Sequence, residues 1–133
     1  MRRKNTTSAG NRRENQVKEL LEGRGWTVKK TRVSKSPIDL VARKGPQQLL
    51  IQVKANTGSP WKNFSRKDRI ELLDELSLYG DGTTAWLVHW MPHGTCDWYS
   101  TDIWALTTRG HATVPSQSHP LSPSWPLASP VRI

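Results

Sequence analysis

Apolar residues recur along the chain at two different spacings, and the spacing separates helices from strands. In residues 12–23 the apolar positions fall at helical intervals on one face, with Asn11 before them as a candidate N-cap. The same kind of pattern follows Ser65 and ends before Gly80. We therefore predict one helix over residues 12–23 and a second that is capped by Ser65.

Five short segments rich in β-branched and aromatic residues have the pattern of strands. They cover residues 26–33, 38–43, 48–55, 83–90 and 96–100. The turn "KGPQ" joins the second segment to the third, and "MPHGT" joins the fourth to the fifth. The resulting order of helix, three strands, helix and two strands predicts an α/β fold, a single domain with a mixed sheet of about five strands flanked by helices.

The two ends of the chain lack this patterning. Residues 1–10 are polar and basic, which predicts a flexible arm, and residues 11–112 form the predicted domain with a short helical turn at "TDIWAL". Residues 113–133 contain five prolines and no acidic residue, so we expect an extended or disordered tail in which Trp125 and Leu127 are candidates for docking.

Charge is distributed unevenly over the 133 residues, whose formal net charge is +9. Residues 1–67 hold 17 Lys or Arg against 4 Asp or Glu, whereas residues 68–133 hold 3 against 7. A basic half indicates a polyanionic partner, and nucleic acid fits better than a membrane because no apolar span of ~18 residues is present. A solvated, solubilising charge run is the alternative interpretation.

The compartment is indicated by what the sequence contains at its start and by its cysteine count. The basic stretch "MRRKNTTSAGNRR" is not followed by the apolar core of a secretory signal. A single cysteine, Cys96, excludes an internal disulfide. We expect a cytoplasmic protein.

Charged and polar residues interrupt the second and third predicted strands, in "PIDLVARKGPQQLLIQVKA". Gln52 and Lys54 are two residues apart on one strand, so they point to the same face. If the two strands pair as a hairpin, Asp39 lies opposite Gln52 and Lys54. Glu14, on the preceding helix, is a fourth candidate because that helix can pack on the sheet.

A buried charge costs several kcal/mol unless it is paired or bound to a metal. Carboxylate and amide oxygens are ligands for a hard divalent cation such as Mg²⁺. A neighbouring ammonium can orient an attacking water and stabilise negative charge that grows on a phosphate. The group predicts a metal site for phosphodiester chemistry. Taken singly, Glu14 is an ordinary acid of a first helical turn, and Asp39 a turn acid.

Glu14 followed by "SKSPIDLVARKG" and "LLIQVKA" resembles the PD-(D/E)xK nuclease superfamily, in which an Asp opens one strand and an acid-x-Lys motif lies on the next. The order of elements and the helix at "FSRKDRIELLDEL" resemble archaeal-type Holliday-junction resolvases, over about residues 11–106. The resemblance implies a restriction-endonuclease-like fold in α-β-β-β-α-β-β order. It also implies an endonuclease that hydrolyses DNA, most of all branched DNA, with Mg²⁺ or Mn²⁺, and that acts as a homodimer.

The resemblance also implies roles for individual residues. Glu14 and Asp39 become metal-ligand carboxylates, Lys54 the catalytic lysine, and Val53 a source of a backbone carbonyl ligand. Gln52 stands where the family usually has a second acid. Mrr-like nucleases also have a Gln-x-Lys motif, and a neutral ligand at this position should weaken the binding of the metal. The DNA path would be lined by ten basic or hydroxyl residues: Arg12, Arg13, Lys30, Arg32, Ser34, Lys35, Ser36, Lys62, Arg66 and Lys67.

Three alternatives stay open at this point. The chain is an Mrr-like or single-strand-specific nuclease, or it is an inactive DNA-binding module of the same fold.

Trp61 and Phe64 are candidates for stacking on bases or for a dimer interface. His89, His93 and Cys96 have spacings that suit zinc, but a fourth ligand is not evident.

Overall fold

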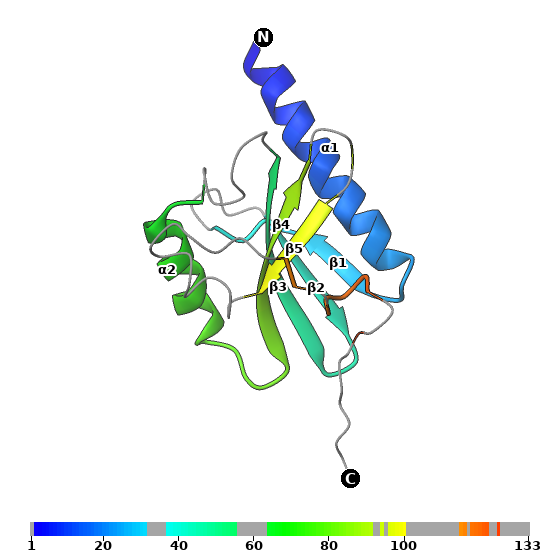
Figure 1. Cartoon of the computed structure of the whole chain (residues 1–133), viewed down its shortest axis with the longest axis vertical. Helices are drawn as coiled ribbons and strands as arrows, with labels where there is room; N and C mark the ends of the chain where they lie inside the picture. Colours follow the sequence, from blue (N-terminus) through cyan, green and yellow to red (C-terminus); the bar gives the residue numbers. More distant parts are fainter. Residues whose placement is uncertain are drawn as a thin grey trace.

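The computed structural model describes residues 2–31, 37–55, 64–91, 94, 96–100, 115–116, 118–122 and 125, with side chains from Arg12 onward. Two helices and five strands follow one another in the order predicted from the sequence (Figure 1). They are α1 (Arg2–Glu22), β1 (Thr27–Lys30), β2 (Leu40–Lys44), β3 (Gln47–Ala55), α2 (Arg66–Leu76), β4 (Thr83–Trp90) and β5 (Cys96–Ser100).

The five strands form one mixed sheet in the order β1-β2-β3-β4-β5. Neighbouring strands are antiparallel except β3 and β4, which are parallel and are connected through α2. The predicted hairpin of β2 and β3 is confirmed, with Leu40 opposite Ile51 and Arg43 opposite Gln48. Gly45 opens its turn at φ +60°, a conformation that glycine adopts without steric cost and that primed hairpin turns require.

Helix α2 begins where the sequence predicts. Ser65 accepts a hydrogen bond from the backbone N–H of Asp68, and the Asp68 carboxylate accepts one from the Ser65 backbone, which together form a capping box. The cap fixes the start of the helix after the β3–α2 connection, so Leu72 points into the core.

Helix α1 begins at Arg2, ten residues earlier than predicted. Residues 2–10, which we expected to form a flexible arm, are helical, and Asn11 lies inside the helix rather than at its cap. This stretch contains no proline, and its arginines, Lys4 and Ala9 favour a helix, whereas residues 5–8 and Gly10 are weaker helix formers. Within the described part of the chain, no helix is both long and apolar enough to cross a membrane.

Two apolar cores lie on opposite faces of the sheet, under α1 and α2 respectively (Figure 1). Alternate residues of β3 and β4 point to each side, as strand geometry requires. The core on the α1 side contains Val17 and Leu21 of the helix and four buried tryptophans: Trp26, Trp86, Trp90 and Trp98. The core on the α2 side is smaller and is built from Ile38, Leu50, Phe64, Leu72, Ala85, Leu87 and Tyr99.

The described part of the C-terminal segment packs on the α1 side of the sheet. The Ser116 N–H donates to the Trp98 carbonyl at 2.7 Å, and the Trp125 indole N–H donates to Gln47 Oε1 at 3.1 Å. The Trp125 ring lies edge-on to Trp86, with 5.8 Å between ring centroids. Docking of Trp125, one of the two candidates named from the sequence, therefore occurs, and this part of the segment is not a free tail. Leu127 and the helical turn expected at residues 101–106 lie outside the described residues.

Candidate metal centre and nucleic-acid surface

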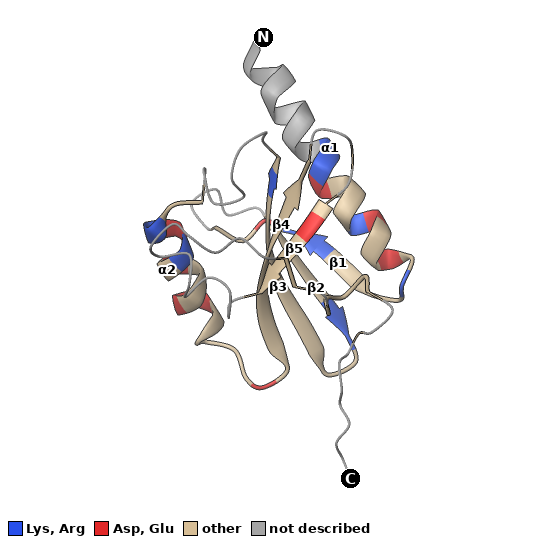
Figure 2. Cartoon of the chain, in the orientation of Figure 1, with Lys and Arg blue, Asp and Glu red and all other residues tan. Residues whose placement is uncertain are grey.

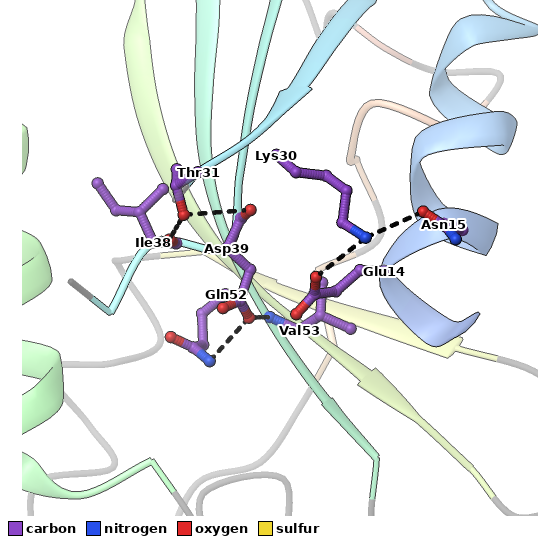
Figure 3. A network of polar contacts seen from close by, with 8 residues as sticks. All are labelled: Glu14, Asn15, Lys30, Thr31, Ile38, Asp39, Gln52 and Val53. Atoms are coloured by element: carbon purple, nitrogen blue, oxygen red, sulfur yellow. Dashed lines mark hydrogen bonds and ion pairs between the residues drawn. The ribbon is translucent and has the colours of Figure 1, made fainter. Parts of the chain in front are cut away.

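Asp39 lies one residue before β2, where its carboxylate meets the backbone of β3 (Figure 3). Asp39 Oδ2 accepts a hydrogen bond from the Val53 N–H at 2.8 Å and another from Gln52 Nε2 at 3.0 Å. Its own N–H donates to the Ile51 carbonyl at 2.8 Å, and its carbonyl accepts from the Thr31 N–H at 3.0 Å. Backbone bonds to both neighbouring strands therefore fix the position of this acid.

The environment of Asp39 raises the pKa of its carboxyl group from 3.8 to about 6. Burial is the largest cause, because it disfavours the charged form, and the negative charge of Glu14 acts in the same direction. The hydrogen bond from Val53 and the positive charges of Lys54 and Lys30 oppose the shift without cancelling it. Without a bound cation, the protein thus holds a carboxylate whose charge is insufficiently compensated.

Glu14 reaches the site from α1, and its carboxylate faces both the Lys30 ammonium and the Asp39 side chain (Figure 3). Lys30 Nζ lies 3.7 Å from Glu14 Oε1 and donates to Asn15 Oδ1 at 3.1 Å. The Glu14 side chain is 23 % exposed, so it is accessible from solvent while it acts on Asp39. The acid that the sequence predicted on the helix, Glu14, therefore lies close enough to Asp39 for its charge to raise the pKa of that carboxyl group.

Gln52 and Val53 follow each other on β3 and contact Asp39 in different ways. The Gln52 side chain is buried and presents its amide N–H, rather than its oxygen, to Asp39. In a strand, the N–H and C=O of one residue point to the same neighbour, so the Val53 carbonyl is directed to the same side of β3 as Asp39.

Lys54 is partly exposed and lies on the same face of β3 as Gln52. Its partner on β4 is His89, whose partner on β5 is Asp97. Cys96, by contrast, pairs with Trp90 and packs on the α1 side of the sheet. Since His89 and Cys96 lie on opposite faces, they do not share a zinc ion, and His93 lies outside the described residues.

The group of Glu14, Asp39, Gln52 and Val53 has the chemistry of a site for a hard divalent cation. Its two carboxylates and backbone carbonyl offer oxygen ligands, whereas the Gln52 amide turns its N–H to Asp39 and would have to present its oxygen to bind a cation. The raised pKa of Asp39 means that its charged form is poorly stabilised by the protein, and a bound cation would stabilise that form. Among the residues that the structure describes, no three His, Cys, Asp or Glu side chains come together, so such a site rests on two acids.

The predicted DNA-contacting residues have different environments. Arg12 and Arg66 are exposed, and Lys67 is exposed with Glu71 at 3.9 Å. Arg13 donates to Gln16 and places its guanidinium 4.9 Å from the centre of the Trp90 ring, so it packs on the core. Lys30 is bound within the site itself. Five other predicted contacts lie outside the described residues: Arg32, Ser34, Lys35, Ser36 and Lys62.

Phe64 does not stack on bases, because its side chain is fully buried in the core on the α2 side. An aromatic residue between two basic ones is typical of a nucleic-acid contact, but here the ring anchors the start of α2. Trp61, the other aromatic candidate, lies outside the described residues.

Two residues of the site were missed from the sequence. Thr31 donates from Oγ1 to the Ile38 carbonyl and binds the Asp39 backbone, and Asn15 accepts from Lys30. Neither residue type signals catalysis by itself. The one available signal was that Lys30 and Thr31 end β1 directly before the segment that carries Asp39.

Comparison with known proteins supports the fold. No protein-family model matches this sequence, and no curated protein matches it either. Among solved structures, the chain is similar to Archaeoglobus fulgidus Hjc, a Holliday junction resolvase from an archaeal hyperthermophile. The TM-score is 0.58 at 20% sequence identity, and the match covers 71% of this chain and 75% of that chain. The chain therefore shares the small α/β fold of this resolvase.

Proposed function

We propose that this protein is a metal-dependent endonuclease that hydrolyses phosphodiester bonds in DNA, with a four-way junction as its preferred substrate. The observation that carries the proposal is the meeting of Asp39, Gln52 and Val53 at one point of the sheet, with Glu14 and Lys54 acting on the same carboxylate. The same fold in a Holliday junction resolvase supports the choice of substrate.

Glu14, Asp39, Gln52 and the Val53 carbonyl would hold the ion, Mg²⁺ or Mn²⁺. A divalent ion bound there would polarise the phosphate and lower the pKa of a water molecule. Lys54 places a positive charge on the exposed side of the same strand, where it stabilises negative charge on the phosphate and orients the attacking water. Lys30 holds Glu14 in place through their ion pair.

Gln52 sets how strongly the site binds its ion. Gln52 is neutral and donates to Asp39, so the site holds two neighbouring carboxylates instead of three. Because Gln52 is neutral, it lowers the affinity for a cation. Half-maximal cleavage should therefore need a higher metal concentration here than in a site with three acids. An inactive DNA-binding module is the rival function, because two carboxylates are a minimal ligand set.

A homodimer is part of this proposal, since resolution of a junction needs two symmetric cuts. In support of it, the α2 region exposes large apolar side chains: Ile70 is 46% exposed, Leu73 39% and Leu78 79%. Light scattering in solution should give twice the mass of the 15.1 kDa chain. An Ile70→Glu, Leu73→Glu variant should give the mass of one chain.

The test of the function is incubation with a synthetic four-way junction, a matched duplex and a single strand, with Mg²⁺ or with EDTA. We expect paired cuts in the junction that require Mg²⁺ and that disappear in Asp39→Ala. Preferred cutting of the single strand would replace the resolvase with a single-strand-specific nuclease. Binding of DNA without any cleavage, in Mg²⁺ and in Mn²⁺, would establish the inactive module instead.

A further inference from the structure

The strands β1 and β2 form a basic edge of the sheet. Their nine residues include Lys29, Lys30, Arg43 and Lys44 and no acid, and Figure 2 shows blue segments on both strands. Two of these cations are already engaged. Lys30 binds Glu14, and Lys44 donates to the Arg24 carbonyl at 2.8 Å on the face that carries Trp26.

Lys29 and Arg43 are different from their neighbours. Both are exposed, and among the described residues neither forms an ion pair or a side-chain hydrogen bond. Lys29 is opposite Val41, and Thr27 is opposite Arg43, so the four side chains lie on one face. Together they line a hollow of about 290 Å³.

The donors around this hollow suit a phosphate group. Arginine offers a planar fork of N–H donors, and lysine a compact ammonium. Thr27 adds a hydroxyl at the same rim. Arginine, lysine and threonine side chains are typical contacts to the phosphates of a nucleic-acid backbone.

The hollow lies on the α2 side of the sheet, the face that carries Lys54. Val28 and Ala42 of the same strands point to the core on the α1 side, so Lys29 and Arg43 point to the other. On β3, Val41 is opposite Leu50, which lies four residues before Lys54. Arg43 is opposite Gln48, which lies six residues before Lys54. At about 3.3 Å per residue, these distances along the strand are about 13 and 20 Å.

We propose that the hollow formed by Thr27, Lys29, Val41 and Arg43 binds the phosphodiester backbone of DNA a few nucleotides away from the bond that is cut. This inference rests on the proposed function for the position of the cut. With about 3.4 Å of helix axis for each phosphate of one strand, the contact lies about four to six nucleotides from the reacting phosphate. The hollow extends the DNA path along the β1–β2 edge, where the sequence analysis named Lys30 but neither Lys29 nor Arg43.

The experiment measures the binding of a labelled 30-base-pair duplex and of a four-way junction at 50–200 mM salt, in EDTA, so that no cleavage occurs. Each phosphate contact contributes about 0.9 to the slope of log affinity against log salt. We expect Lys29→Gln and Arg43→Gln each to reduce the slope by about that amount and to weaken binding severalfold. Arg43→Lys, which keeps the charge, should retain the slope.

Lys44→Gln is the matched control, because it removes the same charge from the residue next to Arg43 but on the opposite face. Its slope should equal that of the unmodified protein. Equal slopes for Lys44→Gln and Arg43→Gln would overturn the inference, as would displacement of the duplex by inorganic phosphate at low millimolar concentration, which marks a small-anion site.

The inference and the proposed nuclease fail separately. If the protein binds DNA through Lys29 and Arg43 but never cleaves it, the hollow stands and the nuclease falls. If it cleaves junctions while both slopes stay unchanged, the nuclease stands and the hollow falls.

Discussion

The two faces of the sheet are built from alternate residues of the same strands, but they differ in chemistry. On the α1 side, four tryptophans, α1 and the docked C-terminal segment close the face with apolar contacts. On the α2 side, the apolar core contains Leu50 but ends before the last residues of β3. The next two side chains of β3 on this face are the polar residues Gln52 and Lys54. The α1 face therefore supplies most of the apolar contacts, whereas the α2 face gives them up for Gln52 and Lys54, and α1 adds Glu14 at the edge of the site.

Asp39 shows what this division costs. Its pKa of about 6 means that, without a cation, the folded protein is destabilised by keeping this carboxylate charged at neutral pH. The tryptophan-rich face can support such a site because its burial does not depend on it. Substitutions on the closed face should thus change stability, and substitutions on the polar face should change binding and catalysis.

The largest expected effect is on the closed face. Trp98 is 1% exposed, contacts the Trp86 ring edge-on and stacks on His119. Trp98→Ala should lower the free energy of unfolding by about 3–5 kcal/mol, as measured by urea denaturation. The control Glu19→Ala, at an exposed position of α1, should change it by less than about 0.5 kcal/mol. A Trp98→Ala variant with normal stability would contradict the assignment of this face.

On the polar face, Lys54→Ala should slow cleavage by about 10²–10³-fold, the usual loss on removal of one group that stabilises charge in the transition state. Single-turnover cleavage of the junction measures the rate, and the melting temperature should stay within a few degrees. Lys18→Ala, which removes a lysine paired with Glu22 on α1, is the matched control and should keep the full rate. Unchanged cleavage in Lys54→Ala would remove this lysine from the mechanism.

Asp39→Asn should stabilise the metal-free protein at pH 7 by about 1–3 kcal/mol. Because the folded pKa of about 6 exceeds the ordinary 3.8, the native state holds the proton more tightly than the unfolded state. The stability that this proton gives is complete below pH 4 and is lost as the pH rises through 6. Asparagine carries no charge, so Asp39→Asn should lose less stability between these pH values than the unmodified protein.

Urea denaturation in EDTA at pH 4 and pH 7 measures this effect, and added Mg²⁺ should stabilise the unmodified protein but not Asp39→Asn. A variant that is less stable at pH 7 would mean that the hydrogen bonds from Gln52 and Val53 outweigh the burial of charge.

The C-terminal segment that carries Trp125 also packs on the closed face, and substitutions in it should have a similar or smaller effect on stability. Trp125→Ala removes an edge-on aromatic contact with Trp86 and a hydrogen bond to Gln47, which together are worth about 1–3 kcal/mol. Trp125→Phe keeps a ring without the N–H donor and should recover part of this loss. If truncation after residue 112 leaves stability unchanged in urea, the segment contributes nothing to the fold.

The smallest expected effect sharpens the role of Gln52. Gln52→Glu adds a carboxylate next to Asp39 Oδ2 and removes an N–H donor to it, so the metal-free protein should be less stable. The affinity for Mn²⁺ should rise by roughly tenfold, or about 1.4 kcal/mol, in isothermal titration. Cleavage need not accelerate, because the new acid can also pair with Lys54. An unchanged Mn²⁺ affinity would show that Gln52 is not a ligand.

The order and type of the elements could be predicted from the sequence because they depend on local patterns. Alternation predicted β4 and β5 at their observed bounds, and Ser65 with Asp68 predicted the start of α2. The spacing of Gln52 and Lys54 predicted that they share a face, and the hairpin placed Asp39 beside Gln52. Periodicity and turn chemistry act over a few residues, so a single sequence contains them.

Other features were decided only by the tertiary structure. The sequence does not distinguish the environments of Arg13, Lys30, Lys29 and Arg43. The fold packs the first on Trp90, pairs the second with Glu14 and leaves the last two around a hollow. Likewise, Trp125 docks against Trp86 from 39 positions away in the chain. Whether a charge is paired, buried or free depends on contacts between distant residues, and these form only when the sheet and both helices are assembled.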